Sequence, residues 1–297
     1  MMRMTRVWGR WGVLSMVAAG LVGCGDDDKP ANTTDTVEVS DMSDDTSSDV
    51  AADTTEEVGP DTIEEVTPDT TEVTEVAGPR CEYTEPACSD EQIAMLQLSD
   101  DKTGGEITEE GTTPGEFLSH IDATAGGFNG TLGYTYARFT ETGLEMVDLS
   151  DEEALESLDW DIAFRRYIAR LNSGVSGPSC VEGGRTAPNT SFETLTEVPT
   201  SLTFRAEQYF TADGCEYVPE TSGIGSPLTV LSSYWNYTGC VTMSGNIYVV
   251  RLRDGRHVKL QFQSYYNPNV QATCDSTGSA PSPNGAGNVR VRWAFID

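Results

Sequence analysis

The chain has 297 residues and a net charge of −30 at pH 7, from 48 acidic and 18 basic side chains. Such an acidic chain offers no basic patch for the phosphates of a nucleic acid, which we exclude as a partner. It contains no zinc-protease, P-loop, dinucleotide-binding or nucleophile-elbow motif. Paired carboxylates arise by chance at this acidity, so we do not expect an enzyme.

Residues 1–24 have the pattern of a bacterial export signal. Arg3, Arg6 and Arg10 precede a short apolar run that ends in Leu-Val-Gly-Cys at Cys24. The run is shorter than the roughly 20 apolar residues that cross a membrane. It predicts a lipoprotein signal peptide with a lipobox, in which Cys24 is acylated and becomes the mature N-terminus; an ordinary signal peptide is the alternative. We therefore expect a protein that is tethered to a membrane by lipid without spanning it.

Residues 25–80 differ from the rest of the chain in composition. They contain no aromatic residue, and acidic side chains dominate, partly in a degenerate repeat that starts at Asp53, Asp61 and Asp69. Such a segment buries too little apolar surface to offset its chain entropy, so we predict a disordered acidic linker. Its acidic start resembles the surface-export signals of some bacterial lipoproteins. This predicts an anchor in the outer membrane and a domain at the cell surface.

Residues 81–297 are long enough to bury the core of a single domain. Six cysteines lie in this range: Cys81, Cys88, Cys180, Cys215, Cys240 and Cys274. An even number in an exported domain predicts disulfides, whose pairing stays open, although Cys81 and Cys88 are close enough to close a local loop. Because the chain has no C-x-x-C pair and only 2 histidines, no metal site is expected.

Alternating apolar and polar side chains predict a predominantly antiparallel sheet in this domain. The alternation is clear in residues 130–139, 201–210, 246–266 and 288–296. Residues 246–266 contain two such runs around the Asp-Gly pair at Asp254, which predicts a hairpin with a two-residue type I′ turn. The predicted fold class is therefore all-β.

One or two short helices are expected between the strands. Ser150 and Glu153 have the spacing of a capping box, and a helix of about two turns would then end near Leu158. Residues 160–171 are ambiguous. Their apolar side chains fall at helical spacing, but the first few also alternate as in a strand, so periodicity alone slightly favours a helix.

Two segments, together with the signal at Cys24 and the aromatic strand at 134–139, resemble a known family. One is WDIAFRR, from Trp160, which leads into NSGVSG, and the other is the hairpin YVVRLRDGRHVKLQFQSYY, from Tyr248. Their order and spacing are similar to those of the HmuY family of bacterial haem-binding lipoproteins. The resemblance implies an HmuY-like all-β domain, so residues 160–171 are predicted as a strand despite their helical spacing.

The resemblance also implies that the domain binds haem, or a related porphyrin, non-covalently for acquisition, and it allows an outer-membrane receptor as a partner. The family archetype holds haem between two axial histidines downstream of the Trp-Asp block, but residues 180–246 contain no histidine. The axial ligands would therefore include Met243 or a tyrosine. The candidate haem-binding residues are Met243, His120, His257, Tyr234, Trp235 and Tyr237.

Each of these residues also has an ordinary structural reading. The two histidines fit strand or loop side chains, Met243 fits a core residue, and the block at Trp160 fits a core strand whose Asp161 pairs locally. The alternative function is a non-haem surface binding or adhesion module on the same β scaffold. Because fold resemblance alone does not establish function, the geometry of the site decides between the two.

Overall fold

A computed structural model describes residues 80–297 of the chain, except 103, 112 and 128–131. Every described residue belongs to one compact unit. The predicted signal peptide, Cys24 and nearly all of the predicted linker lie outside the described residues, so they remain predictions. None of the described helices is long and apolar enough to cross a membrane.

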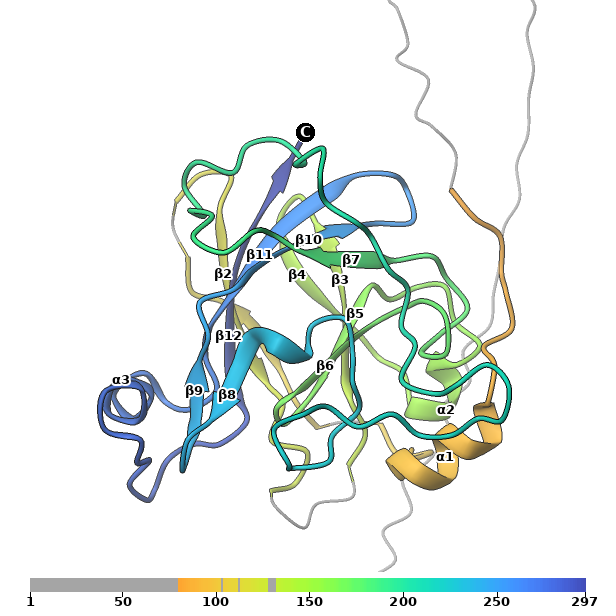
Figure 1. Cartoon of the computed structure of the whole chain (residues 1–297), viewed down its shortest axis with the longest axis horizontal. Coiled ribbons are helices and arrows are strands. Elements are labelled where there is room, and N and C mark those ends of the chain that lie inside the picture. The colour runs from red at the N-terminus through yellow and green to blue at the C-terminus, as the bar shows by residue number, and fades with distance from the viewer. Residues whose placement is uncertain (1–79, 103, 112, 128–131) are drawn as a thin grey trace, which may run out of the picture. The chain divides into compact units, whose positions relative to one another are not determined.

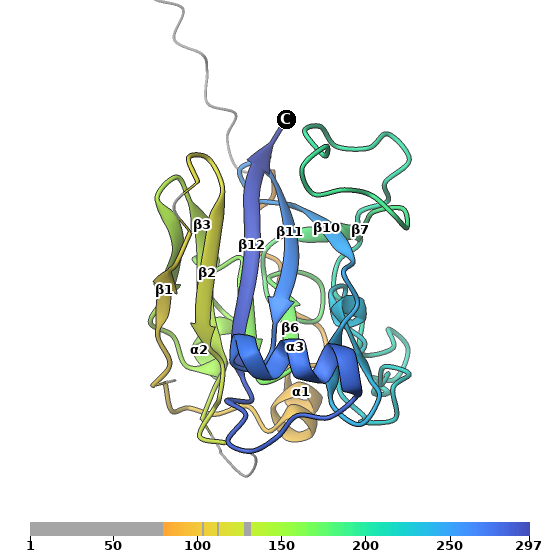
Figure 2. The same ribbon diagram turned by 90° about the vertical axis from the view of Figure 1, so that its left-hand side faces the viewer.

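Two antiparallel sheets carry most of the strands (Figure 1). The larger sheet, seen face on in Figure 2, has the order β1-β2-β12-β11-β10-β7, and the smaller has the order β4-β3-β5-β6. The larger sheet contains β1 (Ile107–Glu109), β2 (Phe117–Asp122), β7 (Glu182–Arg185), β10 (Ile247–Arg251), β11 (His257–Ser264) and β12 (Asn288–Ile296). The smaller contains β3 (Thr135–Thr140), β4 (Gly143–Val147), β5 (Ile162–Arg165) and β6 (Ile168–Leu171). Strands β8 (Trp235–Tyr237) and β9 (Val241–Met243) form a separate hairpin.

Short helices complete the described domain: α1 (Ser89–Leu96), α2 (Asp151–Ala154), the 3₁₀-helix η1 (Ser232–Tyr234) and α3 (Pro268–Thr277). The all-β class with antiparallel pairing and few short helices is confirmed, with three α-helices where one or two were expected. Helix α3 begins at Pro268 and ends at Thr277, and the next residue, Gly278, has a φ of 73°. Proline in the first turn and glycine after the last are typical helix boundaries, so this helix had a signal in the sequence.

The capping box at the start of α2 is confirmed. The Ser150 hydroxyl accepts a hydrogen bond from the Glu153 N–H, and the Glu153 carboxylate accepts one from the Ser150 N–H. The predicted length is wrong, because the helix ends at Ala154 and not near Leu158. The Trp160 indole donates to the Ala154 carbonyl at 2.9 Å, which satisfies an oxygen that a longer helix would have used itself.

The main core lies between the two sheets. Val291 and Trp293 of β12 meet Phe139, Phe164 and other side chains of the smaller sheet there. The rings of Phe139 and Trp293 are 4.9 Å apart, edge to face. A second apolar cluster covers the opposite face of the smaller sheet, under α1 and α2. The smaller sheet is therefore covered on both faces, which fits the three consecutive buried apolar residues at the start of β5, Ile162, Ala163 and Phe164.

The block at 160–171 is not the single strand that we predicted. Strands β5 and β6 form a tight hairpin, in which Arg165 pairs with Ile168 and only Arg166 and Tyr167 make the turn. Arg166 has a φ of 52°, a conformation that two-residue hairpin turns need but arginine rarely adopts. Neither the periodicity nor the resemblance carries a signal for such a turn.

The residues that follow this hairpin lock Trp160 in place. The Asn172 side chain donates to the Trp160 carbonyl at 2.8 Å and accepts from the Ser179 N–H at 3.1 Å. A Cβ at Gly177 would collide with the Asn172 amide and lie 2.8 Å from the Trp160 ring. Asp161 accepts a hydrogen bond from the Phe139 N–H at 2.9 Å. The Trp-Asp block is therefore part of the core.

The predicted strand at 201–210 is wrong. In this segment, isolated bridges join Arg205 to Gly183 and Phe210 to Tyr217. The buried Glu207 carboxylate accepts the N–H groups of Leu171 and Val230, so side-chain hydrogen bonds take the place of a regular ladder here.

The other strands are confirmed. The hairpin at 246–266 forms as β10 and β11, but Arg251 pairs with His257, so the connection is longer than two residues. Gly255 has a φ of 93°, whereas Asp254 is not among the residues with positive φ. The type I′ prediction is therefore wrong. The Asp254 carboxylate instead accepts the Arg256 N–H at 3.0 Å and stabilises the wider turn.

Three disulfides pair all six cysteines of the domain: Cys81–Cys180, Cys88–Cys215 and Cys240–Cys274. The local loop between Cys81 and Cys88 does not form. Each of these two cysteines instead fastens the N-terminal part of the described chain to a distant loop. The disulfide between Cys88 and Cys215 also explains why their cluster with Glu91 is no metal site.

Candidate ligand-binding site

The β8–β9 hairpin brings together three of the six predicted haem-binding residues. In its register Trp235 pairs with Met243 and Tyr237 pairs with Val241. Because directly paired residues, and residues two apart on one strand, share a face, these four side chains lie on the same face of the hairpin. We call Trp235, Tyr237, Val241 and Met243 the β8–β9 face.

Burial grades along this face. Trp235 and Val241 are buried, Met243 is half-buried against the main core, and Tyr237 is 52% exposed. The face thus offers the half-buried thioether of Met243 and the exposed phenol of Tyr237. Both groups can ligate haem iron.

An aromatic cluster continues the face inward. The Tyr167 ring lies 5.5 Å from Trp235 and 6.2 Å from Tyr265, and Tyr265 lies 4.8 Å from Tyr266. The Trp235 indole donates to the Tyr167 carbonyl at 3.1 Å. Burial raises the pKa of Tyr265, and the neighbouring Arg166 opposes that rise. Sequence reasoning missed Tyr167 and Arg166, because they make a turn that was predicted as strand.

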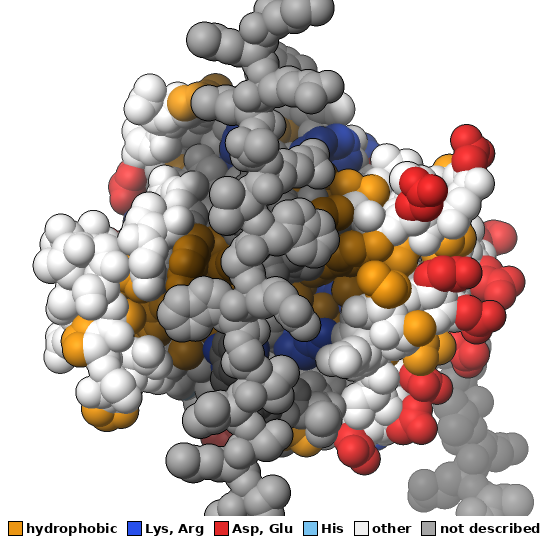
Figure 3. Space-filling model, turned by 60° about the horizontal axis from the view of Figure 1, so that its bottom comes forward, with side chains coloured by type: hydrophobic (Ala, Val, Ile, Leu, Met, Phe, Trp, Pro, Cys, Tyr) orange, Lys and Arg blue, Asp and Glu red, His pale blue; other side chains and the backbone are white. Residues whose placement is uncertain are grey.

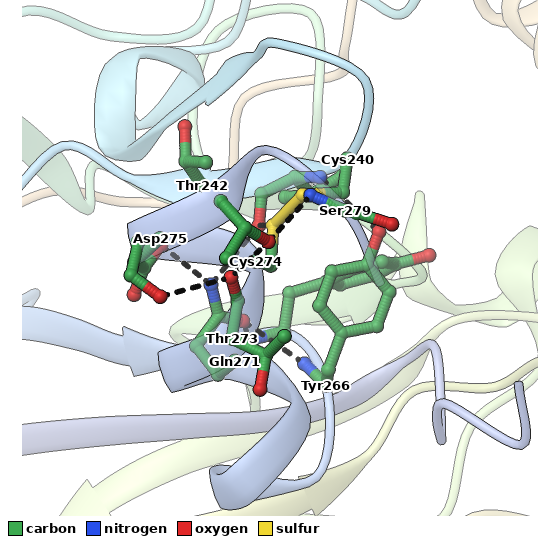
Figure 4. The surroundings of a disulfide bond; sticks show 12 residues. Cys240, Thr242, Tyr266, Gln271, Thr273, Cys274, Asp275 and Ser279 are labelled. Atoms are coloured by element: carbon green, nitrogen blue, oxygen red, sulfur yellow. Dashed lines mark hydrogen bonds between the residues drawn. A yellow bond between two sulfur atoms is a disulfide. The ribbon is translucent and has the colours of Figure 1, made fainter. Parts of the chain in front are cut away.

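Helix α3 holds the hairpin in place (Figure 4). The Cys240–Cys274 disulfide joins the start of β9 to the helix, and the Asp275 carboxylate accepts the Met243 N–H at 2.9 Å. The Gln271 amide donates to the Val241 carbonyl at 3.0 Å and accepts the Tyr265 N–H at 2.9 Å. These contacts fix the backbone on which Met243 sits.

A pocket of about 540 Å³ lies beside the hairpin, a volume suited to a small ligand. Trp235 and Tyr237 line it with Leu228, and serine, threonine and asparagine side chains make most of the remaining wall. Two charged residues, Arg185 and Glu220, also line it. Figure 3 views the domain from the end where β8 and β9 lie in Figure 1. Hydrophobic side chains gather near the middle of that face, and acidic ones lie along one side.

The structure does not bring the two histidines together. His120 pairs with Arg290 on β12 and His257 pairs with Ile296, six residues further along the same strand. At about 3.4 Å per residue, the two are about 20 Å apart, whereas two axial ligands of one iron lie about 4 Å apart. The His120 ring is hydrogen-bonded to Asn288 at 3.0 Å. His257 packs near Phe204, and burial lowers its pKa.

Tyr234 does not line the site either. Its ring stacks on Phe262 at 3.7 Å in the main core, and burial raises the pKa of its phenol far above the ordinary value. Tyr234 therefore supports the hairpin from beneath.

A separate polar cluster lies under the smaller sheet and has a structural role. The buried Arg170 guanidinium is 4.2 Å from the centre of the Tyr134 ring and donates to the Tyr136 hydroxyl. That hydroxyl donates to Asp151 at 2.8 Å. The cluster ties β6, β3 and α2 together.

Residues 134–277 match the family model described as HmuY protein. These residues belong to the HmuY family. The HmuY match contains the whole β8–β9 face, the aromatic cluster and α3, whereas His120 lies outside it. It also contains His257, which the geometry separates from the face.

Several solved structures are similar to this chain. A candidate HmuY-like haem-binding protein of Bacteroides vulgatus is 19% identical, over 65% of this chain and 99% of its own, with a TM-score of 0.41. An apo HmuY analogue of Tannerella forsythia is 18% identical, over 67% of this chain and 100% of its own, with a TM-score of 0.36. A candidate lipoprotein of Bacteroides fragilis is 16% identical, over 64% and 95%, with a TM-score of 0.40. No curated protein matches the chain.

Proposed function

We propose that this protein is a surface-tethered lipoprotein that binds haem, or a related porphyrin, non-covalently on the β8–β9 face. The observation that carries the proposal is the convergence of Trp235, Tyr237 and Met243 on one face beside a pocket, inside the HmuY match. Cys24 is the proposed lipid attachment point, and an outer-membrane receptor is the proposed recipient of the cargo.

The residues of this face fit a porphyrin in chemistry. A flat apolar macrocycle needs aromatic walls, which Trp235 and the aromatic cluster provide. Its iron needs an axial ligand, for which the half-buried Met243 and the exposed Tyr237 are the candidates. Arg166, at the tip of the β5–β6 hairpin beside the aromatic cluster, offers a positive charge for the carboxylates of the macrocycle. Bound haem would supply the iron; the chain supplies walls, a ligand and charge.

A titration with hemin, followed by absorbance, tests this function. We expect a saturable shift of the Soret band with one hemin per chain. An absorbance that rises linearly with added hemin, without a saturable shift of the band, would contradict the proposal. Free hemin and non-specifically adsorbed hemin give such a linear rise.

The non-haem binding module stays as the second candidate because of one observation. The pocket beside Tyr237 is walled mainly by hydroxyl and amide side chains, which suit a polar ligand such as a glycan. Protoporphyrin without iron separates the two candidates. A porphyrin site should bind protoporphyrin through its aromatic walls. A glycan site should bind neither protoporphyrin nor hemin.

A further inference from the structure

Two arginines differ from every other cationic side chain of the described domain. Each of the remaining arginines and lysines between residues 80 and 297 has a hydrogen bond or an ion pair, as Arg138 has with Glu145 and Arg292 with Glu116. The guanidinium groups of Arg185 and Arg205 have neither with any described residue. In a chain with a net charge of −30, two unpaired arginines are unexpected.

These two arginines lie on the same face of one short ribbon. Arg205 pairs with Gly183 through two backbone hydrogen bonds of 2.9 and 3.1 Å, which places it beside β7. Arg185 is two residues further along β7, so its side chain shares the face of Arg205. The Cβ atoms of such diagonal neighbours are less than about 8 Å apart. Two positive charges therefore face the same space and repel each other.

A pocket of about 560 Å³ occupies this space. The pocket lies between the end of β7 and residues 199–205. The long loop that connects these two parts of its wall lies beside β7 and β10 in Figure 2. Its described lining contains no acidic side chain. Besides the two arginines, it carries the hydroxyls of Thr186, Thr190, Ser201 and Thr203.

We propose that this pocket binds an oxyanion, a carboxylate, sulfate or phosphate group carried by a small ligand. Guanidinium groups recognise such groups through paired N–H donors, and hydroxyls complete the hydrogen bonds. The Ser201 and Thr203 hydroxyls make no hydrogen bond with a described residue, so they are free to donate. Binding places one negative charge between two positive ones and removes their repulsion. This site does not depend on the proposed haem function.

The test is a calorimetric titration of the full chain with phosphate, sulfate and acetate at constant ionic strength, with chloride as the baseline. We expect saturable binding of at least one of the three ions. The double variant Arg185→Gln with Arg205→Gln should weaken that binding at least about tenfold, because both charges are lost. The matched control Arg138→Gln removes an exposed arginine that is paired with Glu145 and should bind as the parent does.

The thermal midpoint gives a second readout. Because neither guanidinium has a hydrogen bond or an ion pair with a described residue, the double variant should unfold at about the same temperature as the parent. If the double variant does not fold, the single variants carry the test, each with a partial loss of affinity. Binding of no ion, or equal binding by parent and double variant, would overturn the proposal.

Titration with three sugars then identifies the preferred group: glucose 6-phosphate, glucose 6-sulfate and glucuronate. The pocket should bind most tightly the sugar that carries its preferred oxyanion. Arg185 lines both this pocket and the pocket beside Trp235, so the single variant Arg205→Gln is the one that distinguishes the two sites in a hemin titration. An unchanged hemin affinity is expected, because Arg205 lines the oxyanion pocket and not the pocket beside Trp235.

Discussion

At the residue scale, Glu207 is the most unusual ionisable group outside the candidate sites. Its side chain is buried, and its two oxygens accept the N–H groups of Leu171 at 3.0 Å and Val230 at 2.8 Å. Burial raises the pKa of Glu207 to about 7, against the opposing effect of these two N–H groups and of Arg170. The Glu207 carboxylate thus accepts backbone N–H groups that a neighbouring strand would otherwise satisfy.

The raised pKa makes the stability of the domain depend on pH. Between the ordinary carboxyl value of 4.5 and about 7, the folded chain holds a proton that the unfolded chain has lost. The free energy of unfolding should therefore fall as pH rises through this range, by at most on the order of 3 kcal/mol. Asp161, whose pKa burial raises to about 6, adds to the same trend.

Urea unfolding of the parent and of Glu207→Gln at about pH 5 and about pH 8 checks this prediction. The variant should lose part of the pH dependence, and Asp161 should account for what remains. At low pH it should also be less stable by about 1–3 kcal/mol, because the amide NH₂ meets a backbone N–H in place of an acceptor. The same pH dependence in both proteins would show that Glu207 does not titrate in this range.

At the scale of elements, the β8–β9 hairpin depends on α3. A two-stranded hairpin is marginally stable alone, and here a disulfide and the side chains of Gln271 and Asp275 attach it to the helix. Replacing both Cys240 and Cys274 by serine should lower the free energy of unfolding by about 2–4 kcal/mol. It should also weaken hemin binding, because the backbone of Met243 loses its support.

Urea unfolding and hemin titration measure the two effects. Thr273→Ala is the matched control: it changes a half-buried residue of α3 next to Cys274 and leaves the disulfide intact. If the serine variant bound hemin as tightly as the parent, the helix would not be needed to position the site.

The sequence predicted the strands in which buried and exposed residues alternate. The prediction failed where side-chain hydrogen bonds or turn conformation determine the backbone path. The strand at 288–296 and the hairpin at 246–266 were recognised because apolar and polar residues alternate along them. Residues 201–210 alternate as well, but the Glu207 carboxylate holds them outside a ladder. The turn at Arg166 was missed because it depends on a positive φ that tertiary contacts impose.

The candidate site remains a prediction, and the structure gives the positions of its residues. Strand pairing places Trp235, Tyr237 and Met243 on one face, in the part of the chain to which the resemblance pointed. His120 and His257 pair with distant residues of β12, a separation that sequence alone does not give. Tyr234 lies in the main core, although the next residue, Trp235, begins the hairpin. The pairing of the cysteines could not be predicted, since it depends on loops that meet only in the fold.

At the scale of the whole molecule, we propose a lipid anchor at Cys24, followed by an acidic linker and a binding domain. Cys24→Ser removes the proposed acylation site, and the protein should then move from the membrane fraction to the soluble fraction. Cell fractionation with detection of the protein measures this. Persistent membrane association of the variant would contradict an anchor at Cys24.

The central claim is that the β8–β9 face holds the porphyrin, and the most direct measurement is hemin affinity in matched pairs of variants. Met243→Ala with Tyr237→Phe changes the two candidate ligands. Met146→Ala with Tyr83→Phe makes the same changes at two exposed residues elsewhere. We expect at least about a tenfold loss of affinity in the first pair, as for the loss of one strong contact, and no loss in the second. Equal affinity in both pairs would show that the porphyrin does not bind on the β8–β9 face.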